Sequence, residues 1–121
     1  DPPPTTHHPP PTLRYKLGQG CDQSYELAFE WHTKAALQGY HHSQYCLAFL
    51  YKYGKGCDQS SEQAFEWCAK AALQGDPWSQ YALAELYHAG DGCDQSHEKA
   101  FEWLSKAADQ VTQLLNADLS T

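Results

Sequence analysis

The sequence predicts an all-α protein built as a stack of helical repeats. The letters GCDQS and AFEW recur three times, and the copies begin at residues 20, 56 and 92, so the chain repeats every 36 residues. A fixed period of this length is typical of architectures in which each unit is a pair of helices. Apolar residues at helical spacing on both sides of each GCDQS stretch support the same interpretation. The 121 residues hold about two and a half such units.

Residues 1–12 are predicted to stay outside the stack as an extended arm. The stretch DPPPTTHHPPPT holds six of the seven prolines, and proline neither donates the helical hydrogen bond nor fits inside a helical turn. A polyproline II conformation is therefore expected. Clustered proline and threonine are also the composition of glycosylated stalks. The candidate glycosylation sites are Pro2, Pro3, Pro4, Thr5, Thr6, Pro9, Pro10, Pro11 and Thr12.

The first helix of each complete unit is recognised by its apolar spacing and by the glycines that follow it. In the second unit Leu47, Leu50 and Tyr51 recur at helical spacing, and equivalent residues stand 36 positions later. A glycine loop follows each of these segments, YGKGCDQS at 53–60 and AGDGCDQS at 89–96. Glycine takes the left-handed conformation that ends helices, so both loops are predicted helix ends.

The second helix of each unit is predicted to start at the serine of GCDQS. Ser24, Ser60 and Ser96 stand at the N-cap position, where a hydroxyl accepts a hydrogen bond from a backbone N–H group. Aromatic residues on this helix, and the cysteine of GCDQS, recur at fixed repeat positions and are therefore expected to pack in the core rather than to react. The predicted repeat core comprises Phe29, Trp31, Phe65, Trp67, Phe101, Trp103, Cys21, Cys57 and Cys93.

The pattern G-x-G followed by A-F-E-W-x-x-K-A-A-x-Q-G resembles the Sel1-like repeat, a relative of the tetratricopeptide repeat. The resemblance runs from about Tyr15 to Gln110. It implies a right-handed α-solenoid, a role as a scaffold or adaptor for other proteins, and no catalytic residues to carry over. The expected organisation is a proline-rich arm at 1–12, a repeat solenoid at 13–110 and a C-terminal tail or capping helix at 111–121.

Composition narrows the classes of partner. The net charge of −7 argues against nucleic acid, whose phosphates select clustered lysine and arginine, and against an anionic membrane surface. No run of 18 apolar residues is present, so membrane insertion is not expected. The chain begins at Asp1 and contains no methionine, from which we expect a processed form or an excised domain. An extracellular location is favoured, with a cytoplasmic adaptor as the alternative.

No metal ligand, cofactor or catalytic residue is expected. The seven histidines are scattered or adjacent and lack the short, convergent spacings of zinc sites. The five cysteines cannot all pair within the chain. Cys46 and Cys68 occur once each and fall opposite one another if the two helices of the second unit form an antiparallel hairpin. They are candidates for a disulfide, and the alternative is that both thiols simply pack as apolar groups.

The two ends of the chain together predict association with other copies. The first unit lacks most of its first helix, whereas VTQLLNADL at 111–119 offers a short apolar helix. Docking of this tail into the first unit of the next copy is a head-to-tail contact, which propagates into a filament unless a ring closes. An excised adaptor domain that binds another protein on its concave face is the alternative. The expected assembly interface comprises Val111, Leu114, Leu115, Trp78 and Tyr40.

Overall fold

The computed structural model describes the backbone of residues 21–120 and the side chains of residues 24–117. Every regular element in this part of the chain is an α-helix, which confirms the predicted all-α fold. The proline-rich arm predicted at 1–12 lies outside the described residues. The helices are α2 (Cys21–Leu37), α3 (His41–Tyr53), α4 (Ser61–Leu73), α5 (Pro77–Ala89) and α6 (His97–Ser120).

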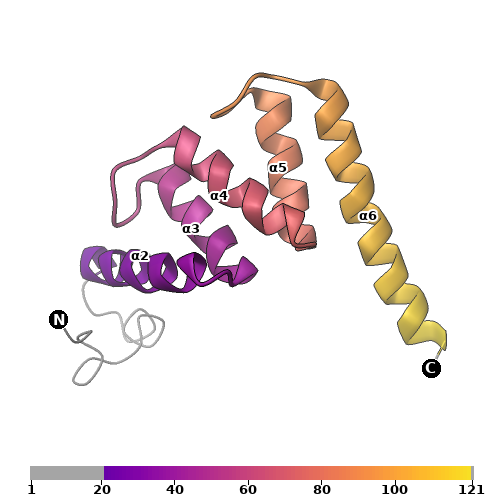
Figure 1. Cartoon of the computed structure of the whole chain (residues 1–121), viewed down its shortest axis with the longest axis horizontal. Coiled ribbons are helices and arrows are strands. Elements are labelled where there is room, and N and C mark those ends of the chain that lie inside the picture. Colours follow the sequence, from indigo (N-terminus) through magenta and orange to yellow (C-terminus); the bar gives the residue numbers. More distant parts are fainter. Residues whose placement is uncertain (1–20, 121) are drawn as a thin grey trace.

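The helices form a stack in which each one packs against the next in the sequence (Figure 1). α2 and α4 are the second helices of the first two repeats, while α3 and α5 are the first helices of the repeats that follow. α6, the second helix of the third repeat, forms one end of the stack (Figure 1). Consecutive units therefore share their core, as expected for a solenoid.

The boundaries of the second and third repeats follow from capping residues at equivalent positions. Ser60 Oγ accepts a hydrogen bond from the Gln63 amide at 3.2 Å, and Ser96 Oγ accepts one from the Lys99 amide at 3.1 Å. These N-caps satisfy backbone donors that have no partner inside the helix. At the other type of boundary, Gly54 ends α3 in the left-handed conformation with a φ of 64°. Ser60, Ser96 and Gly54 confirm the helix ends predicted at their positions. Ser24 does not cap its helix as predicted, because α2 already begins at Cys21 and Ser24 lies within its first turn.

A second glycine in each loop brings consecutive repeats into backbone contact. Gly56, before α4, lies against the carbonyl group of Tyr25 in α2, and Gly92, before α6, lies against the carbonyl group of Ser61 in α4. A Cβ atom at either glycine would collide with that carbonyl. The absence of a side chain at these positions is therefore what allows each repeat to sit directly on the preceding one.

The core is built mainly from leucine and alanine. Leu47, Leu83 and Cys68 are at most 1% exposed, and Ala71 and Ala72 of α4 are equally buried. These residues come from α3, α4 and α5, so the core runs along the middle of the stack. Small side chains at the contact points let the helices approach closely.

The sequence predicted that the large aromatic residues pack in the core. In the structure they lie at the margin of the core and not in its centre. Trp103 is half-buried, and the Lys106 ammonium group lies 4.4 Å from its ring centroid. Phe101 departs furthest from the prediction because its side chain is 70% exposed. The Cys21 side chain lies outside the described residues. The remaining predicted core residues are half-buried, namely Phe29, Trp31, Phe65, Trp67, Cys57 and Cys93.

Replacing Gly92 with alanine is expected to destabilise the third repeat strongly. The positive φ of 77° alone costs an L-residue about 1–2 kcal/mol, and the collision with the Ser61 carbonyl should raise the loss of unfolding free energy above about 3 kcal/mol. Gly39→Ala is the matched control, because Gly39 also has a positive φ but a Cβ atom there meets nothing within 4 Å. Urea unfolding followed by circular dichroism measures both losses. Equal losses in the two variants would contradict the role assigned to the close contact.

Candidate functional site

One face of α4 is covered by the first helix of the next repeat. The Phe65 ring packs edge to face against the Tyr87 ring of α5, with centroids 5.3 Å apart and an interplanar angle of 85°. One turn further along the same face, Cys68 Sγ donates a hydrogen bond to the Ser79 carbonyl oxygen of α5 at 3.3 Å. Ala72 continues this face and is 1% exposed. The face of α4 is thus an apolar stripe that receives a helix.

The same contact joins α2 to α3. The Phe29 ring packs against the Tyr51 ring with centroids 5.4 Å apart and an interplanar angle of 87°. Phe29 and Phe65 are equivalent residues of the repeat, as are Tyr51 and Tyr87. Each second helix therefore meets the following first helix through an identical phenylalanine–tyrosine pair.

The equivalent face of α6 is exposed to solvent. Phe101 and Leu104 stand where α4 has Phe65 and Cys68, yet they are 70% and 41% exposed. The apolar residues continue along this face at spacings of three and four residues, which places them on one side of a helix. We call the five residues the α6 stripe, and they are Phe101, Leu104, Ala108, Val111 and Leu115.

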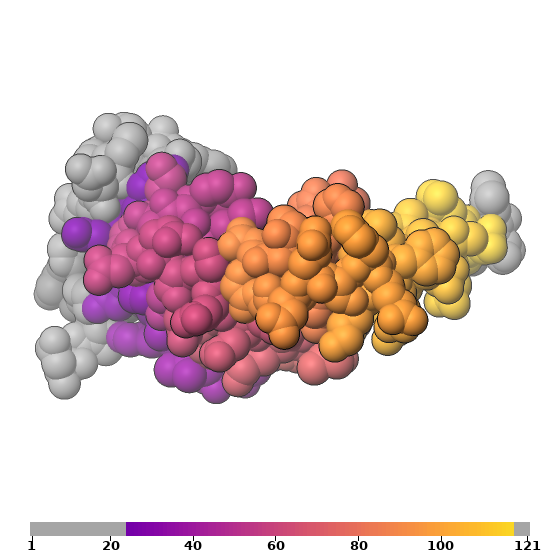
Figure 2. Space-filling view, turned by 90° about the horizontal axis from the view of Figure 1, so that it is seen from above, coloured from indigo at the N-terminus to yellow at the C-terminus, as the bar shows by residue number. Residues whose placement is uncertain are grey.

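The stripe stays uncovered because α6 does not turn where α2 and α4 do. Gly39 and Gly75 end the turns after those helices with φ values of 100° and 99°, and the equivalent position in the third repeat is Val111. Without that glycine the helix runs on to Ser120. The tail expected as a separate element at 111–121 is consequently a continuation of α6, which projects past the end of α5 (Figure 1). In the space-filling view the same segment forms a narrow tip (Figure 2).

The structure places the predicted assembly residues on two helices, α6 and α5, and in the turn before α3. Val111 and Leu115 belong to the α6 stripe with 47% and 59% exposure, and Leu114 is 63% exposed on the same projecting segment. Tyr40 immediately precedes α3, and Trp78 lies in the first turn of α5, so these two residues mark the turns between repeats. Both are exposed. Sequence reasoning assigned Phe101 to the repeat core and did not single out Leu104. The valine in place of the turn glycine was the available signal that α6 continues where α2 and α4 turn.

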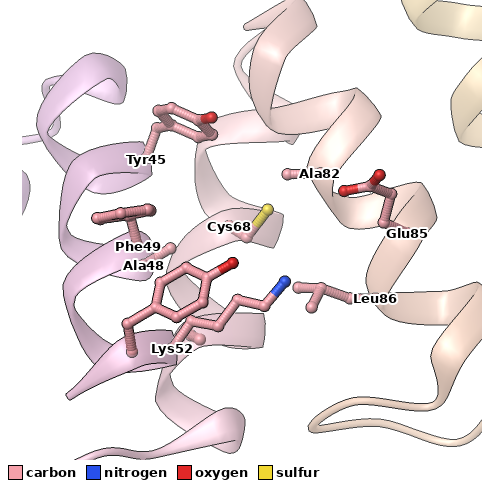
Figure 3. Close-up of a pocket in the computed structure, with 10 residues that line it drawn as sticks. Tyr45, Ala48, Phe49, Lys52, Cys68, Ala82, Glu85 and Leu86 are labelled. Carbon is pink, nitrogen blue, oxygen red and sulfur yellow. The ribbon is translucent and has the colours of Figure 1, made fainter.

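A second surface feature is a groove of about 200 Å³ between α3 and α5 (Figure 3). Tyr45, Phe49 and Lys52 line it from α3, and Glu85 lines it from α5, while Cys68 of α4 lies at its base. The groove thus combines aromatic surface with one cationic and one anionic group. Such a lining suits an extended peptide or a helix better than a small charged ligand.

The cysteines differ in environment. Cys46 and Cys68 are both free thiols, which corrects the expectation of a disulfide between them. The reason is that Cys68 Sγ points to the Ser79 carbonyl on the α5 side, whereas Cys46 Sγ lies 3.6 Å from His42 Nε2 on its own helix. Burial raises the pKa of the Cys68 thiol to about 12. Cys68 is therefore protonated at neutral pH and is not a nucleophile.

The part of the chain that the structure describes contains neither a metal-ligand cluster nor a membrane-spanning helix. No group of three or more histidine, cysteine or acidic side chains converges in a way that could hold a metal ion. No helix there combines the length and the apolar character needed to cross a bilayer.

Alkaline pH is expected to destabilise the folded chain through Cys68. The ordinary thiol pKa is 9.0, and the folded value is about 12. Between these values the unfolded chain releases a proton that the folded chain retains, so stability is fully present below about pH 9 and is lost through this window. The loss is at most about 1.4 kcal/mol per pH unit. Urea unfolding of wild type and Cys68→Ala across this window should show a steeper loss in wild type, and parallel profiles would refute the assignment.

Solved structures share this fold. A protective antigen of uropathogenic Escherichia coli with an SLR fold has a TM-score of 0.74 and 38% identity, over 81% of this chain and 21% of that one. A Sel1 repeat protein from Oxalobacter formigenes has a TM-score of 0.71 and 35% identity, over 83% of this chain and 76% of that one. Cysteine rich protein B of Helicobacter pylori has a TM-score of 0.65 at 17% identity, over 82% and 86% of the two chains, and shows the fold alone. A search among curated proteins gave no match.

The chain spans 21% of the length of the Escherichia coli antigen, so that protein as a whole is a much longer molecule. The family model for the Sel1 repeat matches three segments of the chain, at residues 13–40, 41–76 and 79–111. Proteins built from this repeat are generally non-catalytic scaffolds for protein–protein interaction. With most of its length covered by three matched repeats and with the solenoid fold described above, the chain belongs to the Sel1 repeat family.

Proposed function

We propose that the chain is a non-catalytic scaffold that assembles with copies of itself head to tail. The α6 stripe of one copy is the docking surface in this assembly, and the first repeat of the next copy supplies the helix that covers it. The observation that carries the proposal is the equivalence of two faces. The stripe on α4 is covered by α5 through Phe65 and Tyr87, and the same stripe on α6 is exposed.

The repeat also indicates which residue of the next copy would meet Phe101. Tyr51 and Tyr87 cover the phenylalanines of the two preceding repeats. The residue 36 positions before Tyr51 is Tyr15, which has no preceding repeat within this sequence. Tyr15 lies outside the described residues, so its role in the proposal rests on its repeat position. A second copy that presents Tyr15 to Phe101 would continue the solenoid from one molecule into the next.

The energetics favour an association that depends on concentration. Complete burial of a leucine, valine or phenylalanine side chain contributes about 1.5–3 kcal/mol, so the four large side chains of the stripe supply at most about 12 kcal/mol. Loss of translational and rotational freedom costs about 4–15 kcal/mol. Burial of the stripe alone therefore leaves little net binding free energy. Contacts from Leu114 and from the proline-rich arm would increase this net binding free energy. An arm of twelve residues in the polyproline II conformation reaches about 37 Å, enough to lie along a neighbouring copy.

Placing a charge in the α6 stripe is expected to abolish assembly. Leu115→Glu would bury a carboxylate at the contact, which is unfavourable without a partner. Gln113→Glu adds the same charge to an exposed position on the other side of α6 and is the matched control. Sedimentation velocity should show concentration-dependent polymers for wild type and for the control, and monomers for Leu115→Glu. Wild-type monomers at every concentration, or unchanged polymers in Leu115→Glu, would refute the proposal.

Tyr15→Ala tests the other half of the contact. The proposal expects weaker assembly in this variant, with a helical content by circular dichroism close to that of wild type. An equal mixture of Leu115→Glu and Tyr15→Ala chains retains one intact stripe and one intact first repeat. Such a mixture should therefore form heterodimers but no long polymers, because each chain is defective at one end only.

Glycosylation of the arm and an extracellular location belong to the same proposal. Candidate positions are the proline and threonine residues of 1–12, such as Thr5 and Thr6. We expect peptides that contain residues 1–12, released from the natural protein by digestion, to be heavier by mass spectrometry than their sequence alone by the mass of attached sugars. Arm peptides at the mass of the bare sequence would rule out the sugar while leaving the assembly proposal standing.

The groove between α3 and α5 supports a second candidate function, that of an adaptor domain that binds a segment of another protein. Its aromatic lining and its opposite charges at Lys52 and Glu85 suit a peptide partner. Phe49, which is 49% exposed, distinguishes the two functions. If the α6 stripe is the interface between copies, Phe49→Ala should leave self-assembly unchanged. If the groove binds a partner peptide, Phe49→Ala should lower the affinity for that peptide.

A further inference from the structure

Two histidines from consecutive helices face one another at the α5–α6 loop. His88 lies in the last turn of α5, and His97 is the first residue of α6. Their Nδ1 atoms are 3.0 Å apart, and their ring centroids are 4.8 Å apart with an interplanar angle of 59°. Both side chains are exposed. Nothing in the packing of the core requires imidazole rings at either position.

The separation of the two rings is set by backbone contacts of the loop. The Ser96 amide donates a hydrogen bond to the Tyr87 carbonyl oxygen at 2.9 Å, which joins the residues next to the two histidines. The Gln95 side chain donates to the His88 carbonyl oxygen at 2.8 Å. Gly90 turns the chain out of α5 in the left-handed conformation with a φ of 69°. The loop therefore holds the backbone of both residues at a separation that brings the two Nδ1 atoms within hydrogen-bonding distance of one another.

The distance fits the coordination geometry of particular metal ions. An imidazole nitrogen binds a divalent metal at about 2.1 Å, so two nitrogens at a right angle around one ion lie about 3.0 Å apart. Right-angle positions occur in the square-planar and octahedral arrangements that Cu²⁺ and Ni²⁺ prefer, whereas a tetrahedral zinc site requires a wider spacing. We propose that His88 and His97 form a two-histidine clamp for Cu²⁺ or Ni²⁺, with water in the remaining coordination positions.

A histidine–cysteine pair in the first turns of α3 is a poorer candidate. His42 Nε2 lies 3.6 Å from Cys46 Sγ, but a thiol must lose its proton to bind a metal well. Burial and the neighbouring Asp76 carboxylate raise the pKa of the Cys46 thiol, so this pair keeps its proton. The absence of a third converging side chain among the described residues makes the clamp an exchangeable site and not a buried structural one.

The second repeat provides an internal comparison. Its α3–α4 loop has the same backbone contact, from the Ser60 amide to the Tyr51 carbonyl oxygen at 2.9 Å. The positions equivalent to the two histidines are Lys52 and Ser61. The loop geometry is thus repeated while the ligands are present in the third repeat alone.

Isothermal titration of the full chain with Ni²⁺ tests the clamp without oxidising the thiols. His88→Gln and His97→Gln should each lower the number of bound Ni²⁺ ions by one, or weaken that site by more than about tenfold, because even outer-sphere ligand changes cost about 10- to 100-fold. His42→Gln is the matched control and should bind as wild type does. Unchanged binding in His88→Gln, or loss of the same site in His42→Gln, would overturn the proposal.

Transfer of the site to the second repeat gives an independent measurement. Lys52→His combined with Ser61→His should add one Ni²⁺ ion per chain at a comparable affinity, because the loop holds both positions as it does in the third repeat. Each single substitution should add none. A double variant that folds by circular dichroism and binds no additional ion would contradict the claim that the loop geometry builds the clamp.

Discussion

The contact between each second helix and the first helix that follows it is the constraint on which the remaining structure depends. Its aromatic part is the phenylalanine–tyrosine pair, and its backbone part is the glycine of the loop lying on the carbonyl of the preceding repeat. The two parts act together because the rings reach one another only if the loop allows the repeats to approach. Alanine on the facing surfaces serves the same purpose. Stability in such a stack is a sum of interfaces between neighbours.

An interface that works between neighbours does not by itself specify where the stack ends. α4 is stable against α5 because the next helix in the chain covers it, and the α6 stripe is at least as apolar as the stripe on α4, since Leu104 stands where α4 has Cys68. The difference arises at one residue, Val111, which replaces the turn glycine and sends the helix onward. Exposed apolar patches often mark interaction surfaces in proteins, which is the basis of the proposed assembly. Internal packing and the proposed assembly are thus one interaction used within and between molecules.

Much of the fold was predictable because each repeat position occurs three times in the sequence, and the three residues support the same assignment. The helices, their serine caps and their glycine ends followed from residues such as Ser60 and Gly54. The prediction failed where identical residues have different neighbours. Phe101 was predicted to be buried by analogy with Phe65, and it is exposed because burial depends on the next helix and not on the residue itself. The size of tryptophan likewise keeps Trp67 at the margin of a narrow alanine seam.

The candidate sites show the same limit. Cys46 and Cys68 fall opposite one another in a schematic hairpin, but the rotation of each helix about its axis decides where a thiol points. His88 and His97 are nine residues apart in the sequence, and no spacing rule places them together. Their approach depends on the hydrogen bonds of the intervening loop, which the structure supplies.

The projecting half of α6 links the folding of one molecule to the presence of another. An isolated helical segment of about ten residues is marginal in water because nucleation is costly and few hydrogen bonds offset it. Beyond α5 no helix of residues 21–120 lies beside this segment (Figure 1), so under the proposed assembly its helical order draws on the copy that covers the stripe. The free-energy cost of ordering this segment then reduces the favourable free energy with which each new subunit binds. Growth at that end would be cooperative with local folding, and a chain end without a partner would differ in secondary structure from the chains behind it.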